Sequence, residues 1–141
     1  VDEPTTGLDP EERIRIRNLL VDFGRDRSVL FSSHVVEDLA STCNDLCILK
    51  KGKKIYDGTI QHLICEADNH VFSCMLSSEE EFLKVQEKYK ITGKNYSNEG
   101  IDIRLVSKSV PDVTGIEFQY VKPTLEDAYI YKSSSEKFEE I

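Results

Sequence analysis

Long hydrophobic runs and clustered positive charge are both missing from this chain of 141 residues. No apolar run approaches the roughly 20 residues needed to cross a bilayer, and no secretory signal peptide opens the sequence. The 18 Lys and Arg residues are outnumbered by 26 Asp and Glu, which gives a formal net charge of −8. Because a nucleic-acid backbone requires clustered Lys and Arg, we expect no nucleic-acid partner, and membrane association only through another protein.

Paired cysteines are missing as well. Cys43 and Cys47 are spaced C-x-x-x-C, and Cys65 and Cys74 supply no second pair of ligands. This pattern favours reduced, structural thiols over the alternative of a metal site, and it indicates a cytosolic chain. With 39% apolar and 31% charged residues, the composition is typical of folded protein, and the length suits one ordinary domain or two small ones.

The first ten residues, VDEPTTGLDP, carry the densest chemistry. A strand ending at Val1 would bring the adjacent carboxylates of Asp2 and Glu3 to the edge where parallel α/β sheets bind ligands. One carboxylate can hold magnesium, directly or through water, while its neighbour reaches an attacking water. Pro4 and Gly7 then predict the end of the strand and a tight turn. A solvated acidic turn before a helix is the alternative, but it leaves the acidic pair unexplained.

A β-α-β order is predicted for residues 1–32. Asp9 suits a helix N-cap, with Pro10 at the first helical position and Glu12 in a capping box. The helix should end at about Phe23 and bury one apolar stripe. This stripe consists of Ile16, Leu19, Leu20 and Phe23. The stretch Ser28–Ser32, with three consecutive apolar residues, predicts a strand buried on both faces, as in a parallel sheet.

His34 follows this second strand. Because the ends of parallel strands lie on one side of a sheet, we expect His34 to lie beside Glu3 despite the 31 positions that separate them. Considered alone, a histidine after two serines is more often a cap or a packed surface residue than a ligand. Its predicted position beside two carboxylates favours a role in the same site.

The block DEPTTGLDP resembles the Walker B and D-loop segment of the ABC ATPases, the nucleotide-binding subunits of ABC transporters. The sequence SSH that ends at His34 resembles the H-loop of the same family. The resemblance implies that Asp2 serves magnesium and Mg-ATP, Glu3 is the general base or positions the attacking water, and His34 contacts the γ-phosphate. It also implies that two cassettes sandwich ATP head to tail, with Asp9 meeting the phosphate loop of the partner cassette.

The resemblance continues to about residue 66. The pattern predicts a short helix at 36–43, a hairpin whose turn contains Gly52, and a helix capped by Thr59. The turn sequence KKGKK is also compatible with a nucleic-acid or localisation patch. In an acidic chain a solvated hairpin tip is favoured over that alternative.

A small α+β unit is predicted for residues 68–132. Helices should be capped by Ser78 and Thr124, and strands are expected at 71–76, 91–96, 101–106 and 116–120. The stretch VKPTLEDAY resembles the Pro-Ser/Thr-Leu-Glu-Asp ending of ATPase subunits of bacterial drug, peptide and antibiotic exporters. A helix cap and an apolar stripe explain the residues of this motif, so we give its acidic residues no catalytic role.

The predicted fold class is α/β, with the C-terminal part of a P-loop ABC ATPase domain followed by a small α+β accessory domain. We assign residues 1–67 to the ATPase part, 68–132 to the accessory domain and 133–141 to a flexible tail. The phosphate-binding loop, the Gln loop and the LSGGQ signature of the family do not occur in this sequence. We therefore expect the chain to be the C-terminal portion of a longer polypeptide.

The resemblance implies an ATP-hydrolysing subunit of an ABC transporter, an exporter by its C-terminal motif, that uses ATP and magnesium. Its expected partners are a second ATP-binding subunit and a membrane permease that holds it at the cytoplasmic face of the cell membrane. The fragment alone should lack ATPase activity and should self-associate through exposed apolar surface. Two alternatives remain open: a fragment of a soluble, non-transport ABC ATPase, and a regulatory or binding module in residues 68–141.

Overall fold

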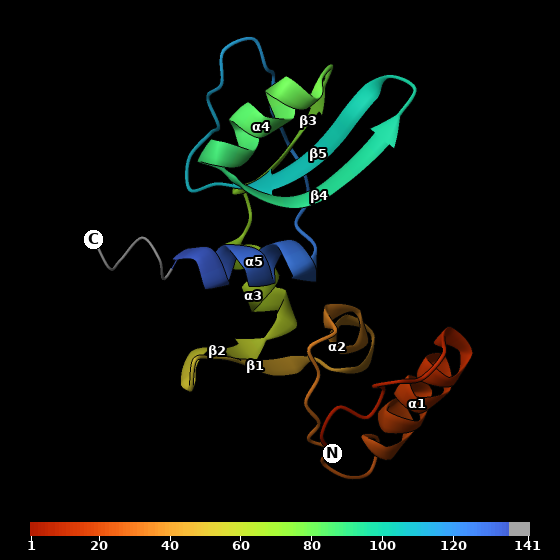
Figure 1. The fold of residues 1–141 in the computed structure, drawn as a ribbon. Coiled ribbons are helices and arrows are strands. Elements are labelled where there is room, and N and C mark those ends of the chain that lie inside the picture. Colours follow the sequence, from red (N-terminus) through yellow and green to blue (C-terminus); the bar gives the residue numbers. More distant parts are fainter. Residues whose placement is uncertain (136–141) are drawn as a thin grey trace.

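The computed structural model describes residues 1–135, which form two antiparallel sheets with helices around them (Figure 1). The N-terminal part contains α1 (Pro10–Phe23), α2 (Val36–Thr42), β1 (Asp45–Lys50), β2 (Lys53–Thr59) and α3 (Ile60–Glu66). The C-terminal part contains β3 (Val71–Leu76), α4 (Glu79–Lys88), β4 (Lys90–Ser97), β5 (Gly100–Val106), β6 (Gln119–Tyr120) and α5 (Leu125–Ser135). The chain is therefore mixed α/β. Within the described residues, no helix has both the length and the apolar character needed to span a bilayer.

Capping residues start the helices where the sequence predicts. The Asp9 carboxylate accepts a hydrogen bond from the Glu12 amide at 2.9 Å. Thr59 caps α3 and Ser78 caps α4 through amides three residues further along the chain. These bonds satisfy amides that have no partner inside a helix, which is why the first residues of the helices could be predicted locally.

The β1–β2 hairpin also forms where its turn residues predict. Its two turn residues, Lys51 and Gly52, have φ values of 50° and 77°. A two-residue hairpin turn of this kind needs positive φ at both positions, and glycine satisfies that need without strain. The lysines on either side of Gly52 are exposed, as expected for a solvated tip.

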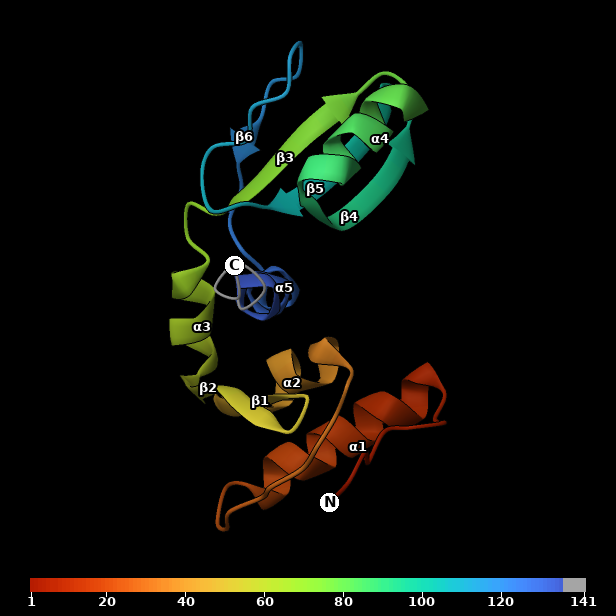
Figure 2. The ribbon, with the colours of Figure 1, turned by 60° about the vertical axis from the view of Figure 1, so that its left-hand side comes forward.

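The stretch Ser28–Ser32 is not a buried strand, contrary to the sequence prediction. Only Ser32 pairs, through an isolated parallel bridge to Asp2, and Leu30 is 88% exposed. The apolar stripe of α1 is not buried either, since Leu19 and Phe23 are 45% and 43% exposed. An apolar pattern shows which faces of a segment can be buried. Actual burial requires other elements to pack on those faces. Within residues 1–135, α1 packs mainly on α2 (Figure 2).

The C-terminal sheet has the strand order β4-β5-β3-β6, and every neighbouring pair is antiparallel. Helix α4 covers one face of this sheet (Figure 2). The core between them consists of Phe72, Cys74, Leu76, Phe82, Val85, Ile101, Ile103 and Leu105. The strand predicted at 116–120 is shortened to β6, because only its last two residues pair with β3. Ile116 and Phe118 nevertheless pack against the core, as their alternation predicts.

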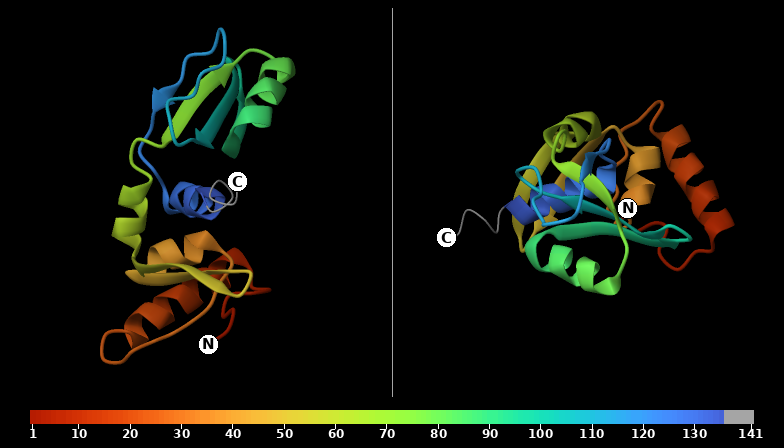
Figure 3. Two further views of the ribbon diagram at one scale, coloured as in Figure 1. Left: turned by 90° about the vertical axis from the view of Figure 1, so that its left-hand side faces the viewer. Right: turned by 90° about the horizontal axis from the view of Figure 1, so that it is seen from above.

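Helix α5 joins the two parts of the chain. It lies between the four-stranded sheet and the β1–β2 hairpin, and it packs against α3 and α2 (Figure 3). The core around it combines residues from both sides of the predicted boundary after residue 67: Ile48, Tyr56, Leu63, Ala67, Val71, Val106, Leu125 and Ala128. The division into two domains stays a proposal, with α5 shared between them. Helix α5 extends through Ser135, inside the expected tail at 133–141, of which 136–141 lie outside the described residues.

A buried carboxylate fastens α5 to the C-terminal sheet. Asp127 is 2% exposed, lies 2.7 Å from Arg104 and accepts a hydrogen bond from Thr92 at 2.8 Å. It also accepts from the Thr124 amide at 2.9 Å, so Thr124 and Asp127 form a reciprocal cap. Burial raises the pKa of Asp127, but the hydrogen bonds from Arg104 and Thr124 outweigh it and hold that pKa below its ordinary value. These contacts give Asp127 a structural role.

Candidate functional site

The site begins where the first three residues run beside Ser32. The Glu3 amide donates to the Ser32 carbonyl at 3.0 Å, and the Ser32 amide donates to the Val1 carbonyl at 3.0 Å. The Ser32 hydroxyl donates to the Asp2 carboxylate and accepts from the Glu3 amide. Two segments far apart in the sequence are thus held in parallel register, so the residues after Ser32 lie beside those after Asp2.

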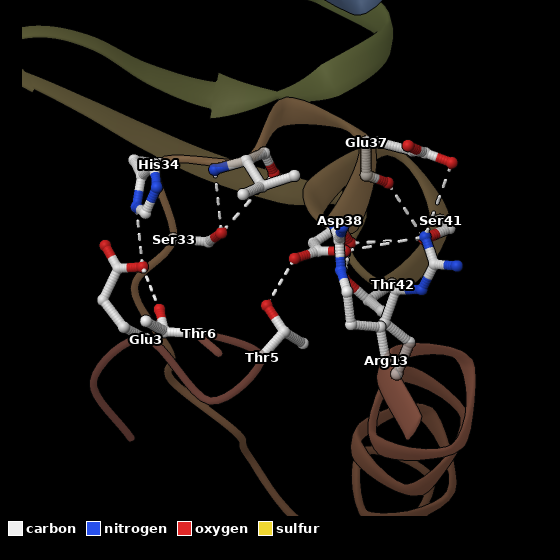
Figure 4. Close-up of polar contacts among 12 residues, drawn as sticks. Glu3, Thr5, Thr6, Arg13, Ser33, His34, Glu37, Asp38, Ser41 and Thr42 are labelled. Atoms are coloured by element: carbon white, nitrogen blue, oxygen red, sulfur yellow. Dashed lines mark hydrogen bonds and ion pairs between the residues drawn. The ribbon is translucent and has the colours of Figure 1, made fainter. Parts of the chain in front are cut away.

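Glu3 and His34 are in direct contact, as their spacing predicts. His34 Nδ1 lies 2.8 Å from Glu3 Oε2, and the Thr6 hydroxyl donates to the same oxygen at 3.1 Å (Figure 4). Within residues 1–135 the other carboxylate oxygen, Oε1, makes no hydrogen bond, and the Glu3 side chain is 34% exposed. One oxygen of Glu3 is therefore held by the protein, while the other can accept a hydrogen bond from a water or ligand.

The backbone of Glu3 adopts a conformation that is uncommon for residues other than glycine. Its φ of 49° lies in the left-handed region, which residues 1–135 otherwise show outside glycine only at Lys51 and Asn69. The Thr6 amide donates to the Glu3 carbonyl at 3.2 Å, so a tight turn through Pro4 accompanies this conformation. Such conformations are unfavourable by about 1–3 kcal/mol and persist where the surroundings enforce them, frequently at functional sites.

The protonation state of the pair follows from these contacts. The hydrogen bond from His34 holds the pKa of Glu3 below its ordinary value, although desolvation opposes this effect. Glu3 is therefore ionised at neutral pH and only accepts hydrogen bonds, so Nδ1 of His34 carries the shared hydrogen. In a neutral His34 this leaves Nε2 as an acceptor, on a side chain that is 74% exposed. The pair thus presents a carboxylate oxygen and an imidazole nitrogen to solvent.

Asp2 lies beside this pair, and its carboxylate accepts a hydrogen bond from the Ser32 hydroxyl. In the described part of the chain, no group of three or more His, Cys, Asp or Glu side chains is arranged to hold a metal ion. A magnesium ion does not need such a group, because it keeps several waters and binds through one or two carboxylates plus substrate phosphates. The exposed carboxylate of Asp2 and the neighbouring hydroxyl are hard oxygen donors that fit this ion.

Asp9 is not part of this contact. Its carboxylate caps α1 through the Glu12 amide, and between residues 1 and 135 it makes no other hydrogen bond. The structure therefore explains Asp9 as a helix cap. Its expected position at the contact with a second cassette stays a prediction.

A buried carboxylate that the sequence analysis did not single out holds the turn after Glu3. Asp38 is 1% exposed on α2, and its Oδ2 accepts from the Thr5 hydroxyl at 2.5 Å (Figure 4). Its Oδ1 lies 3.1 Å from Arg13 and 3.6 Å from Arg17, both on α1. Burial raises the pKa of Asp38, but the hydrogen bonds from Thr5 and Arg13 outweigh it and lower that pKa overall. The turn, α1 and α2 thus meet at one carboxylate.

The sequence does carry a signal for part of this cluster. Arg13 and Arg17 are one helical turn apart and therefore lie on the same side of α1. Asp38 lies two residues after Val36, on the side of α2 opposite the stripe of Val36, Leu39 and Ala40, so the apolar pattern does not indicate that it is buried. Two cations on one side of a helix indicate an acidic partner, but the sequence does not identify Asp38 as that partner. Nothing in the sequence distinguishes Thr5 from the threonine that follows it.

Known proteins with similar sequences cover most of this chain. No protein-family model matches it. Several similar proteins are named Nod factor export ATP-binding protein I. The one from Rhizobium meliloti (strain 1021) is 30% identical over 145 residues, which cover 92% of this chain and 41% of that protein. The one from Burkholderia thailandensis is 29% identical over 139 residues, covering 92% of this chain and 45% of the relative.

A shorter match is closer in sequence. The protein of the same name from Rhizobium leguminosarum bv. viciae is 41% identical over 70 residues, which cover 47% of this chain and 22% of that protein. The chain thus spans less than half the length of each of these relatives.

Proposed function

This chain belongs to the ATP-binding subunits of ABC transporters and corresponds to their C-terminal part, and we propose that it acts in ATP hydrolysis within the complete subunit. The contact of 2.8 Å between Glu3 and His34 carries the proposal. A carboxylate with one free oxygen, oriented by an imidazole, suits the task of orienting a water for attack on a phosphoryl group. Its position at the end of paired segments is typical of ligand sites in α/β proteins.

Glu3 would use Oε1 to accept a hydrogen bond from the attacking water. His34 and Thr6 hold Oε2 and so limit the directions in which Oε1 can point. Because its pKa is lowered, Glu3 is a weaker proton acceptor than an ordinary carboxylate but a fully ionised hydrogen-bond acceptor. These contacts favour a water-positioning role over full proton abstraction before attack. His34 would donate a hydrogen bond from its exposed Nε2 to the γ-phosphate, which requires the doubly protonated ring because Nδ1 already carries the hydrogen shared with Glu3.

Asp2 is the residue that we propose to hold magnesium, directly or through water. When bound with ATP, Mg²⁺ supplies charge neutralisation on the phosphates. The Ser32 hydroxyl, which donates to Asp2, would keep that carboxylate oriented. Both groups lie next to the Glu3–His34 pair, so the three proposed roles are compatible within one site.

The complete subunit would work with two partners. A second ATP-binding subunit would close over the nucleotide, with Asp9 at the contact, and a membrane permease would hold the pair at the cytoplasmic face of the membrane. The relatives are named as export proteins, which supports export as the direction of transport. Because the sequence contains no phosphate-binding loop, the chain alone should neither grip Mg-ATP nor hydrolyse it.

Glu3→Gln in the complete subunit tests this proposal. The amide keeps the size of the side chain but removes the charge that orients water, so turnover should fall by about 10²- to 10⁴-fold. ATP binding should be unchanged, because Glu3 is proposed to contact water and not nucleotide. Steady-state ATPase rates and nucleotide titrations measure the two effects. Glu87→Gln, on the exposed side of α4, is the matched control, and wild-type turnover in Glu3→Gln would rule out the role of Glu3.

A further inference from the structure

A second cavity, separate from the Glu3 site, lies beside α5. Its volume is about 540 Å³, and its walls come from α5, the end of β1, the junction between α4 and β4, and the end of β5. Small-molecule sites in proteins typically have volumes of about 300–1,000 Å³. None of the four residues proposed for the ATP site lines this cavity, so a ligand here would serve another purpose.

Lysines surround this cavity. They are Lys50, Lys88, Lys90 and Lys108. Among residues 1–135, no carboxylate oxygen lies within 4.0 Å of the ammonium groups of Lys50, Lys88 and Lys90, so none of the three forms an ion pair there. The Lys50 ammonium donates to the Ser133 carbonyl at 2.6 Å, which fixes one positive charge at the wall. In a chain with net charge −8, this local concentration of positive charge favours an anion.

Aromatic rings form much of the remaining wall. Tyr131 stacks on His70 with ring centroids 4.8 Å apart, and the Tyr89 hydroxyl accepts from the Asp112 amide at 2.9 Å. Two of the three lining tyrosines are therefore held in place by contacts outside the cavity. The third, Tyr129, is 40% exposed and also lines another cavity, beside α2 and β1. Rings held in this way provide a preformed apolar surface for a ligand.

We propose that this cavity binds a small anionic amphiphile, a carboxylate or phosphate group attached to an apolar body. The anion would lie among Lys50, Lys88 and Lys90, and the apolar body would pack against Tyr129 and Tyr131. The lysines give preference over cationic or neutral molecules of the same shape, and the tyrosines give preference over inorganic anions. This inference goes beyond the proposed ATPase function and does not depend on it.

Titration of the 141-residue chain with decanoate, followed by calorimetry and by amide chemical shifts, tests the proposal. We expect saturable binding of one molecule, with shifts at Ser107, Tyr129 and Tyr131. Inorganic phosphate and decyltrimethylammonium should not saturate the site. The double variant Lys88→Glu and Lys90→Glu should weaken decanoate binding by at least about tenfold, because two attractive charges become repulsive.

The matched control is the double variant Arg15→Glu and Arg25→Glu, which makes the same change of charge at exposed positions on and just after α1, away from the cavity. It should leave decanoate affinity within about twofold of wild type, since exposed charges beyond a Debye length are screened. Equal weakening in both variants, equal binding of the cationic amphiphile, or no saturation by about 1 mM decanoate would overturn the proposal. Binding that appears only after removal of residues 136–141 would also overturn it, because that acidic segment would then be the occupant.

Discussion

Replacing Asp38 with asparagine tests whether one buried carboxylate holds the turn that carries Glu3. The change removes the charge that faces Arg13 and Arg17 but keeps the shape of the side chain. Removing one partner of a buried ion pair usually destabilises a protein by about 3–5 kcal/mol. The Arg13 side chain is 29% exposed and can be rehydrated, so we expect the lower end, about 3 kcal/mol.

The effect of Asp38→Asn should be local, because α1 packs mainly on α2 and contributes no buried residue. Amide hydrogen exchange should accelerate by about 10²-fold in α1, since each 1.4 kcal/mol corresponds to about a factor of ten. The amides of Thr6 and Leu8, which donate to carbonyls within the turn, should accelerate as well. The amides of β3 and β5 should keep their wild-type rates, because these strands pack mainly against each other and against β4, β6, α4 and α5.

Glu37→Gln is the matched control for this prediction. Its carboxylate is 78% exposed and 3.9 Å from Arg17, and exposed pairs contribute only about 0–1 kcal/mol. Acid provides a second check. Because the pKa of folded Asp38 is lowered, its stabilisation is present above the unfolded value of 3.8 and is lost as the pH falls through the folded value. The difference between wild type and Asp38→Asn should shrink there. Equal exchange rates in both variants at neutral pH would refute the reasoning.

Three further outcomes follow from other contacts. Asp127→Asn should lower the free energy of unfolding by about 3 kcal/mol in urea titrations, because it breaks the buried pair that fastens α5. Gly100→Ala should cost more than about 2 kcal/mol in the same assay, since its φ is 139° and a Cβ would lie 2.3 Å from the Leu76 carbonyl oxygen. Gly24→Ala, with negative φ and nothing closer than 3.4 Å, should be nearly neutral. Light scattering should detect self-association that Leu19→Lys reduces, and a monomeric wild type would contradict the proposal of apolar docking through α1.

Sequence reasoning succeeds here where the determining contact is local. The caps at Asp9, Thr59 and Ser78 lie within three residues of the amides that they bind, so the sequence specifies them directly. The hairpin at Gly52 is determined by two adjacent turn residues. The Glu3–His34 contact is long-range, but it follows from a simple rule on where consecutive parallel segments end.

Sequence reasoning fails where an outcome depends on what covers a surface. The apolar pattern near Leu30 predicts a strand inside a sheet. In residues 1–135 the stretch instead pairs only with the first residues of the chain, through the Ser32 bridge and a hydrogen bond of 2.7 Å from the Val1 amino group to the Leu30 carbonyl. The Asp38 cluster was missed for a related reason. Its ion pair joins residues 25 positions apart on two helices, and the sequence does not show that those helices pack together.

The stretch from Ser32 to Asp38 controls the orientation of Glu3 through three contacts. The position of His34 after a paired segment accounts for only one of them. Ser32 fixes the Glu3 backbone, His34 holds its carboxylate, and Asp38 holds Thr5 two residues further along the turn. All three contacts arise from one continuous piece of chain that ends in α2. A displacement of α2 would therefore move Glu3 and His34 together and preserve their contact, whereas loosening Asp38 would free the turn while His34 stays in place. The orientation of the pair thus depends on α2 as much as on the paired segments at residues 1–3 and 32.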